Sequence, residues 1–203
     1  MTKIMESFFS FYCKYPYRSI CLKYITLVYQ IEVKTLVEVG VWEGVNAMLL
    51  RRLFPEASFY LIDSWEPTLN YLKHGHPVCK DPEKYEEAFQ KTQKQFKNDP
   101  KVTILRKTSK EGSLVLPDEL DLVFLDACHQ YSSVKEDITL WEKKVRAGGI
   151  LSGHDYHHRY PGVVRAVNEC LKGRFFLGAD KVWGSVITHN QMTDLLANQE
   201  APF

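Results

Sequence analysis

Three side chains able to move protons or bind cations follow two short apolar runs in the second half of the sequence. Asp126 and His129 come just after residues 120–125, and Asp155 ends the segment 150–155. If both runs are parallel strands, their carboxyl ends meet at one sheet edge, where ligands bind in open α/β sheets. An imidazole there has the right ordinary pKa to take a proton from a hydroxyl group. His129 is therefore a candidate general base, although a structural histidine bound to a loop remains the alternative.

A second feature is a glycine loop at the end of an earlier apolar run. The segment 37–44 reads Val-Glu-Val-Gly-Val-Trp-Glu-Gly, with Gly40 and Gly44 just before an expected helix. Glycines let a backbone approach a ligand closely, and a helix N-terminus offers amide hydrogens. The spacing is GxxxG, with Glu38 before it, rather than the GxGxxG of dinucleotide sites. The pattern favours a nucleoside bound without a pyrophosphate.

Asp63 follows the apolar run 58–62 and the glycine loop. A carboxylate at that place in a doubly wound sheet can accept hydrogen bonds from both ribose hydroxyls. Trp42 and Trp65 flank the same strand ends and could form walls of the pocket. They could equally be plain core residues.

These side chains require a sheet whose strands are joined by helices. Strands are expected at 35–39, 58–62, 102–105, 120–125, 150–155, 175–177 and 181–187, and helices at 46–54, 82–98, 133–144 and 162–171. The alternation predicts an α/β fold: a doubly wound, mostly parallel sheet of about seven strands with helices on both faces. The glycine pair 148–149 is expected to separate a helix from the strand after it.

Composition narrows the function classes. Lys plus Arg number 26 and Asp plus Glu 25, giving a net charge of +1, so no overall charge draws the chain to nucleic acid or a membrane. The five cysteines form no CxxC pair, which argues against a disulfide framework or a zinc site. The aromatic first 30 residues are interrupted by lysine and arginine well before the roughly 18 apolar residues of a membrane span. With no targeting segment recognised, a cytoplasmic location is expected.

The later motifs resemble a known family. The chain contains DAxHxY at 126–131 and GGxxxxHDY at 148–156. With the glycine loop and Asp63, these motifs resemble class I S-adenosylmethionine-dependent methyltransferases, in particular a branch of O-methyltransferases. The resemblance spans residues 36–186 and implies the seven-stranded Rossmann-like sheet of that class.

The resemblance also implies roles for individual residues. Glu38, Gly40 and Gly44 would lie under the methionine part of S-adenosylmethionine, and Asp63 would hold the ribose. Ser64, Trp65 and Ser109 would lie near the adenine, although the position before Ser109, commonly acidic in the family, is Thr108. Asp126 would form the floor of the catalytic site beside the sulfonium methyl group.

Metal-dependent members of this branch hold magnesium with the Asp of DxxH and an acidic pair after the fifth strand. This chain has Asp126 but carries His154-Asp155 in place of the acidic pair. Magnesium prefers oxygen ligands, so the resemblance leaves open magnesium, another divalent metal or no metal at these three residues.

The expected organisation is a helical cap at 1–30 and a methyltransferase domain at 31–203, with a lid or substrate insertion at 66–100. The expected activity is O-methylation of a small-molecule hydroxyl, with no nucleic-acid or membrane partner and with a homo-oligomer through the N-terminal segment as an option. A non-catalytic nucleotide-binding scaffold is the main alternative. An NAD-dependent oxidoreductase is disfavoured because GxGxxG is missing. Sugars, phenols, lipids and peptides all remain open as acceptors.

Overall fold

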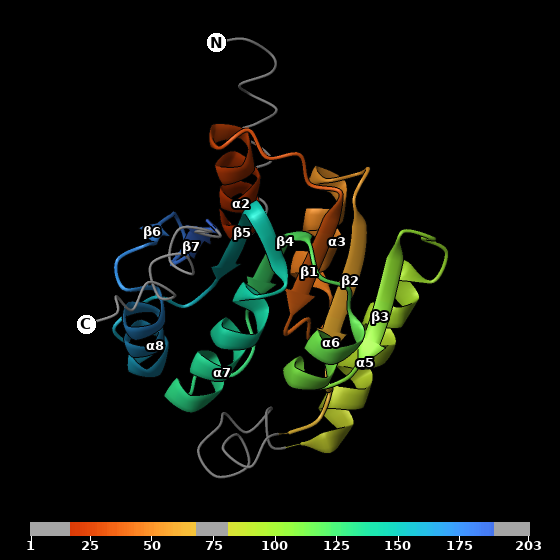
Figure 1. Cartoon of the computed structure of the whole chain (residues 1–203). Helices are drawn as coiled ribbons and strands as arrows, with labels where there is room; N and C mark the ends of the chain where they lie inside the picture. The colour runs from red at the N-terminus through yellow and green to blue at the C-terminus, as the bar shows by residue number, and fades with distance from the viewer. Residues whose placement is uncertain (1–16, 68–80, 189–203) are drawn as a thin grey trace, which may run out of the picture.

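A central β-sheet is formed by the apolar runs of the sequence (Figure 1). The computed structural model describes residues 17–67 and 81–188. The strands are β1 (Thr35–Val39), β2 (Ser58–Asp63), β3 (Val102–Arg106), β4 (Leu120–Leu125), β5 (Val145–Gly153), β6 (Phe176–Leu177) and β7 (Trp183–Val186). Their order is β3-β2-β1-β4-β5-β7-β6. The first five are parallel, and β7 pairs antiparallel with both β5 and β6. The predicted doubly wound, mostly parallel seven-stranded sheet is confirmed.

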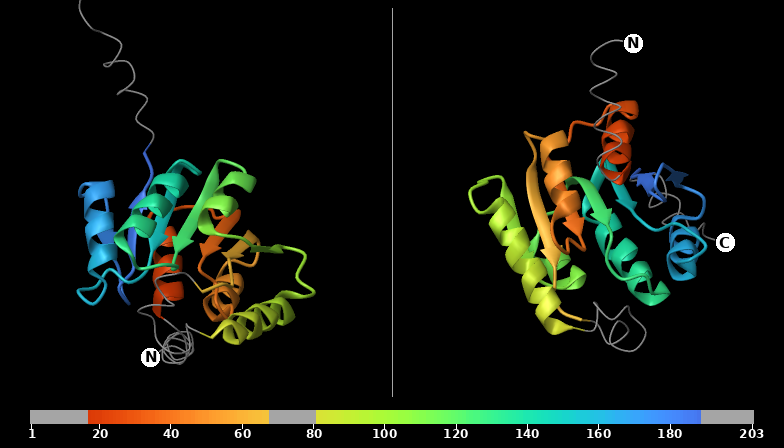
Figure 2. Two further views of the ribbon diagram at one scale, coloured as in Figure 1. Left: turned by 90° about the horizontal axis from the view of Figure 1, so that it is seen from below. Right: turned by 180° about the vertical axis from the view of Figure 1, so that it is seen from behind.

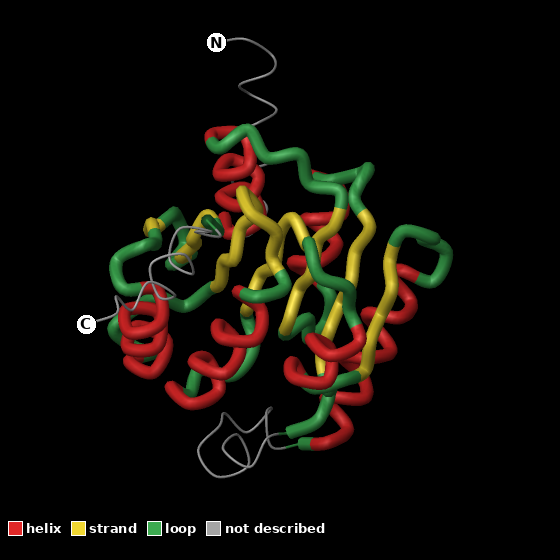
Figure 3. Tube along the Cα trace, in the orientation of Figure 1, coloured by secondary structure: helices red, strands yellow, loops and turns green. Residues whose placement is uncertain are grey.

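Helices cover both faces of the sheet, as the strand sequences require (Figures 2 and 3). The helices are α2 (Tyr17–Val28), α3 (Val45–Leu53), α5 (Pro82–Phe96), α6 (Ser109–Val115), α7 (Tyr131–Glu142) and α8 (Pro161–Leu171). Alternate residues of β4 point to opposite faces: Leu122 and Phe124 pack with α2, α3 and α5, whereas Val123 and Leu125 pack with α7 and α8. Both faces are apolar because both are buried, which is typical of parallel sheets.

One local expectation was wrong, and one helix had not been expected. The glycine pair lies inside β5, where Gly149 fits because a Cβ there would lie 2.9 Å from the carbonyl oxygen of Asp121. The register with β4 is irregular at this point, so the glycines form a bulge rather than a break. Helix α6 was not expected. Its signal is a capping box in which Thr108 and Glu111 bond reciprocally, a pattern readable from sequence.

The expected cap and insertion are described only in part. Helix α2 is the described portion of the cap, and α5 that of the insertion; residues 1–16 and 68–80 lie outside the described residues. The proposed boundaries of both units stay predictions. Within the described ranges, no helix has the length and apolarity needed to cross a membrane.

Candidate active site

The candidate site lies at the carboxyl edge of the parallel strands, the lower edge of the sheet in Figure 1. A cavity of about 500 Å³ opens there beside the ends of β1, β2 and β4. Six of the nine predicted cofactor residues line it: Gly40, Trp42, Asp63, Ser64, Ser109 and Asp126. The volume is within the range of small-molecule sites. The other three, Glu38, Gly44 and Trp65, do not line the cavity.

The glycine loop brings β1 close to the carboxyl end of β4. Gly40 has φ +90°, and a Cβ on it would lie 2.1 Å from the carbonyl oxygen of Asp126. The amide of Asp126 donates to the carbonyl of Val39 at 2.8 Å. Only glycine allows this approach, so the loop sets the position of Asp126. Gly44, with φ +75°, precedes α3 and packs against Thr92 and Gln95 of α5.

Asp63 holds the loop in shape. One carboxylate oxygen accepts from the amides of Val41 and Trp42, both at 2.9 Å, and the other accepts from the amide of Trp65 at 2.8 Å. Burial raises the pKa of Asp63, while these backbone hydrogen bonds oppose the rise. With a backbone hydrogen bond from Ser64 as well, four donors meet the roughly four acceptor positions of this carboxylate, so the ribose role of Asp63 stays a prediction.

The two tryptophans have different places. Trp42 lines the cavity and packs edge-on against Tyr85, with the ring centroids 5.0 Å apart. Trp65 is fully buried, and its indole N–H donates to the carbonyl of Trp42 at 2.8 Å. Trp65 therefore supports the loop from the core and does not lie along the cavity wall as the resemblance implies.

Ser64 and Ser109 both line the cavity, and they follow the carboxyl ends of the neighbouring parallel strands β2 and β3. Ser109 begins α6, and its hydroxyl accepts a hydrogen bond from the indole N–H of Trp141 at 2.9 Å. It also bonds Asp137, whose pKa rises to about 6 because burial outweighs that bond. Ser109 is thus held in a fixed position at the edge of the cavity.

Glu38 is buried, and a short polar chain holds it. Asn46 donates to Glu38 Oε1 at 2.8 Å and accepts from the hydroxyl of Ser19 at 2.5 Å. The other carboxylate oxygen, Oε2, is buried without a hydrogen-bond partner among the described residues. Burial raises the pKa of Glu38 to about 8 against the hydrogen bond from Asn46. Sequence reasoning missed Asn46 and Ser19, which carry no recognisable motif.

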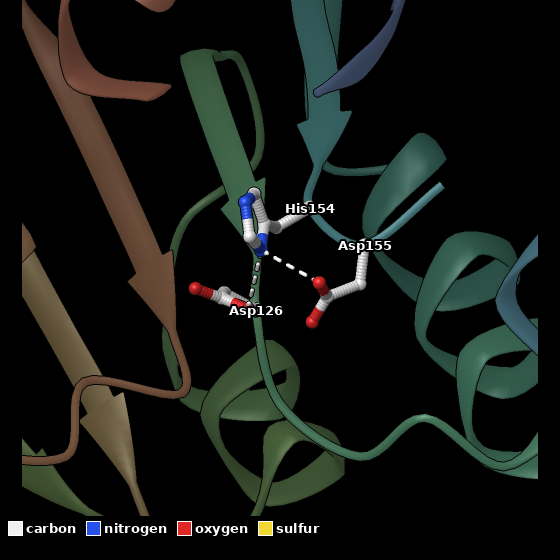
Figure 4. Close-up of side chains that lie close together, drawn as sticks. All are labelled: Asp126, His154 and Asp155. Carbon is white, nitrogen blue, oxygen red and sulfur yellow. Dashed lines mark ion pairs between the residues drawn. The ribbon is translucent and has the colours of Figure 1, made fainter. Parts of the chain in front are cut away.

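The polar side chains after β4 and β5 converge as predicted (Figure 4). His154 Nδ1 lies 3.2 Å from Asp155 Oδ1 and 3.6 Å from Asp126 Oδ1. His129 Nε2 lies 2.8 Å from Asp155 Oδ2. Asp155 reaches between the histidines with φ +60°, a strained conformation of the kind that occurs at functional sites.

Neighbouring carboxylates control the charge of His154. Burial alone lowers the pKa of His154, but hydrogen bonds to Asp126 and Asp155 and their charges outweigh it and raise the pKa to about 9. Burial likewise acts to raise the pKa of Asp155, but hydrogen bonds from His129 and His154 hold it well below its usual range. The structure thus favours a protonated His154 beside an ionised Asp155.

Arg18, at the start of α2, is a site residue that sequence reasoning missed. Its Nη1 donates to Asp126 Oδ2 at 2.7 Å and lies 3.4 Å from His154 Nδ1. The arginine is 108 residues from Asp126 in sequence, and it lies in a segment that reads only as an aromatic-rich cap.

The residues present fit S-adenosylmethionine. Glu38 Oε2 is a buried acceptor without a donor among the described residues, and such an atom costs free energy until a donor meets it. Glu38 directly precedes Val39 and Gly40, which line the cavity, and the α-ammonium group of the methionine part is a cation whose charge complements this carboxylate. Asp63, Ser109 and Asp126 also line the same cavity. A ligand with ribose, adenine and sulfonium parts requires such a shared cavity.

The residues fit a magnesium ion poorly. Asp126, His154 and Asp155 offer ligand atoms within 4.8 Å of one another, which is compact enough for a metal. However, imidazole is not a ligand that magnesium favours. The guanidinium of Arg18 also pairs with the Asp126 carboxylate.

Comparison with known proteins agrees with this geometry. Residues 37–156 match the family model described as a methyltransferase domain. The O-methyltransferase NovP shares 19% identity over 84% of this chain and 77% of that chain, with a TM-score of 0.61. The O-methyltransferase TomG from Streptomyces achromogenes, involved in tomaymycin synthesis and solved in complex with S-adenosylmethionine, shares 16% identity over 82% of this chain and 78% of that chain, with a TM-score of 0.57.

At these identities the structural likeness is one of fold. No curated protein matches the sequence. The family model covers more than half of the chain and spans the loop at Gly40, Asp63 and the convergent residues after β4 and β5. The chain therefore belongs to the methyltransferase domain family and is an S-adenosylmethionine-dependent methyltransferase.

Proposed function

We propose that this enzyme transfers the methyl group of S-adenosylmethionine to a hydroxyl oxygen of a small-molecule acceptor, with His129 as the general base. The observation that carries this proposal is the place of His129. It lines the cofactor cavity and also a second groove of about 480 Å³. The second groove is formed by residues 129–132 and 159–162. An acceptor in that groove would meet the cofactor cavity at His129.

The hydrogen bond to Asp155 supports the same role. It places a proton on His129 Nε2, and the other ring nitrogen, Nδ1, has no partner among the described residues. In the neutral imidazole Nδ1 is then the acceptor. The ring of Tyr160 lies 4.4 Å from the imidazole, centroid to centroid, and limits its rotation. Asp155 is therefore a positioning residue for the base.

The bound cofactor supplies an activated methyl group on a positively charged sulfur. The acceptor oxygen attacks the methyl carbon as the carbon–sulfur bond breaks, and the electron pair of that bond stays on the sulfur, which becomes neutral. The hydroxyl proton passes to His129 Nδ1. The remaining residues position the reactants: the loop at Gly40, the carboxylate of Asp63 and the floor at Asp126. Such positioning supplies a large part of the barrier reduction in two-reactant transfers.

The test is a screen of phenols, sugars, hydroxy acids and other hydroxyl compounds, with release of S-adenosylhomocysteine as the readout. His129→Ala should lower turnover by about 10² to 10⁴, the usual contribution of a general base, with cofactor affinity unchanged. His157→Ala is the matched control, because His157 packs on His158 and lines neither cavity. Cofactor binding without transfer to any acceptor would favour a non-catalytic scaffold. A cofactor affinity lost in His129→Ala would refute the base role.

The location in the cytoplasm and an oligomer through the N-terminal segment are further proposals. The oligomer is supported by exposed apolar side chains on α2, where Tyr24 and Leu27 are each more than 60% exposed. Sedimentation analysis of the full chain tests it.

A further inference from the structure

Arg18 contacts Asp126 and His154, two of the residues that could bind a metal ion. Its Nη1 lies within 3.4 Å of both Asp126 Oδ2 and His154 Nδ1. Those two residues are two of the three side chains grouped closely enough to bind a metal. A divalent cation between them would approach a guanidinium, which remains charged at any physiological pH. The arginine and a metal therefore compete for one position.

The fold holds Arg18 in place from several directions. Its own amide donates to Asp180 Oδ2 at 3.3 Å, in the turn between β6 and β7. The next residue, Ser19, is fully buried and bonds Asn46. One turn further along α2, Leu22 is buried in the core. The Arg18 side chain is only 25% exposed, unlike an arginine on a solvated helix face.

Arg18 offsets part of the negative charge of this cluster. Carboxylates of Asp126, Asp155 and Asp180 surround His154, at 3.6, 3.2 and 3.9 Å from its nearest ring nitrogen. Arg18 contributes a fixed positive charge to this acidic group. A paired and hydrogen-bonded charge is the form in which carboxylates are stably buried.

Building on the proposed function, we infer that Arg18 is the resident cation of the methyl-transfer site, so that the enzyme works without a divalent metal and helix α2 completes the site. Arg18 is a positioning residue: it holds the Asp126 carboxylate at the cavity floor and prevents that carboxylate from binding a metal. The N-terminal helix is thus part of the active site rather than only a cover over the sheet.

The test titrates Mn²⁺ into the full-length protein, its Arg18→Ala and Arg18→Lys variants, and Lys23→Ala. Mn²⁺ accepts both carboxylate and imidazole ligands. Lys23 lies on the same helix, over the ring of Phe54, so Lys23→Ala removes one positive charge without touching the site. Binding is followed by the electron paramagnetic resonance of free Mn²⁺, and folding by circular dichroism.

We expect the purified wild-type protein to hold no stoichiometric metal and to bind Mn²⁺ weakly. Arg18→Ala should bind Mn²⁺ at least about tenfold more tightly, because removing a charge in contact with the ligands relieves repulsion that is only partly screened. Arg18→Lys and Lys23→Ala should behave like the wild type. Stoichiometric metal in the wild type, or equal Mn²⁺ affinity in folded Arg18→Ala and Lys23→Ala, would overturn the inference.

A parallel titration with S-adenosylhomocysteine separates this inference from the proposed function. If all four proteins bind the product, the cofactor site stands whatever the Mn²⁺ result. Once an acceptor is known, wild-type turnover should be unaffected by a chelator, whereas a chelator-sensitive wild type would contradict the role of Arg18.

Discussion

Glu38→Gln provides the sharpest test of how the cofactor is held. Burial raises the pKa of Glu38 to about 8, so about a tenth of the side chain is ionised at pH 7. A positively charged ammonium group bound at the adjoining cavity wall of Val39 and Gly40 favours the ionised form of Glu38. Cofactor binding should therefore release close to one proton per site near neutral pH, and glutamine, which does not titrate, should release none.

The magnitude follows from the same pKa. If only the ionised carboxylate pairs with the ammonium, affinity follows the ionised fraction, which rises about fiftyfold between pH 6 and 8. A hydrogen bond to a charged group contributes about 1.5–3 kcal/mol, which is about 10- to 150-fold in affinity. Compared with the wild type, Glu38→Gln should lose most of this 10- to 150-fold contribution to cofactor affinity at pH 8 and little of it at pH 6. Asn46 can still donate to the glutamine oxygen, so the loop is retained.

The assay is calorimetric titration with S-adenosylhomocysteine, which has the same methionine part, at pH 6, 7 and 8. Pairs of buffers with different ionisation enthalpies give the number of protons released. The affinity of the variant should depend little on pH. Its binding should release about one proton fewer than binding to the wild type. The same slope and proton count in both proteins would refute the assignment of Glu38.

Stability gives an independent check without any ligand. A carboxyl group with a raised pKa binds more protons in the folded than in the unfolded state between the two pKa values, so its contribution to stability falls as pH rises through that window. For Glu38 the window runs from 4.5 to about 8. As pH rises over this range, the free energy of unfolding of Glu38→Gln should therefore increase relative to that of the wild type. A constant difference would mean that the carboxyl pKa is not raised.

Three further outcomes follow from the site geometry. Gly40→Ala should destabilise the protein by about 3 kcal/mol or more in urea unfolding. The new Cβ would lie 2.1 Å from the Asp126 carbonyl oxygen, and this overlap forces a backbone shift. The control Gly173→Ala, at φ +79° with no atom within 4 Å of the new Cβ, should cost only about 1 kcal/mol. Asp63→Asn should lower the melting temperature and weaken binding of S-adenosylhomocysteine. An amide offers one acceptor oxygen in place of two, so a loop N–H is left unpaired, which costs about 1–3 kcal/mol of stability. An unchanged melting temperature would contradict this. The raised pKa of His154, about 9, should contribute stability that is complete below pH 6.5 and lost as pH rises through 9, so the stability difference between wild type and His154→Gln should shrink over that range.

The sequence alone determined the sheet and much of the cavity wall. Apolar runs at 35–39, 58–62 and 120–125 predicted β1, β2 and β4 to within a residue, because strands buried on both faces must be continuously apolar. The residues that follow those strands are placed by topology, since parallel strands bring their carboxyl ends to one edge. For this reason the amino-acid pattern suffices to assign Gly40, Asp63 and Asp126 to one site.

Only the tertiary structure decided what surrounds those residues. Ser19 and Asn46 lie on helices where polar side chains usually face solvent, yet both are buried and tie α2 and α3 to Glu38. The family resemblance places Trp65 beside the adenine, but the residue is buried because the turn after β2 directs its ring into the core. Sequence periodicity identifies which face of an element is apolar, but it does not identify the partners that the element will meet.

Arg18 shows this limit most clearly. In the sequence it is one basic residue that interrupts an aromatic segment, and it is 108 positions from the aspartate it pairs with. Its role depends on where α2 docks on the sheet, which is set by the packing of Leu22 and Ile25 in the core and by Asp180 at the helix start. The sequence specified the chemistry of the carboxylates, whereas long-range packing decided which cation meets them.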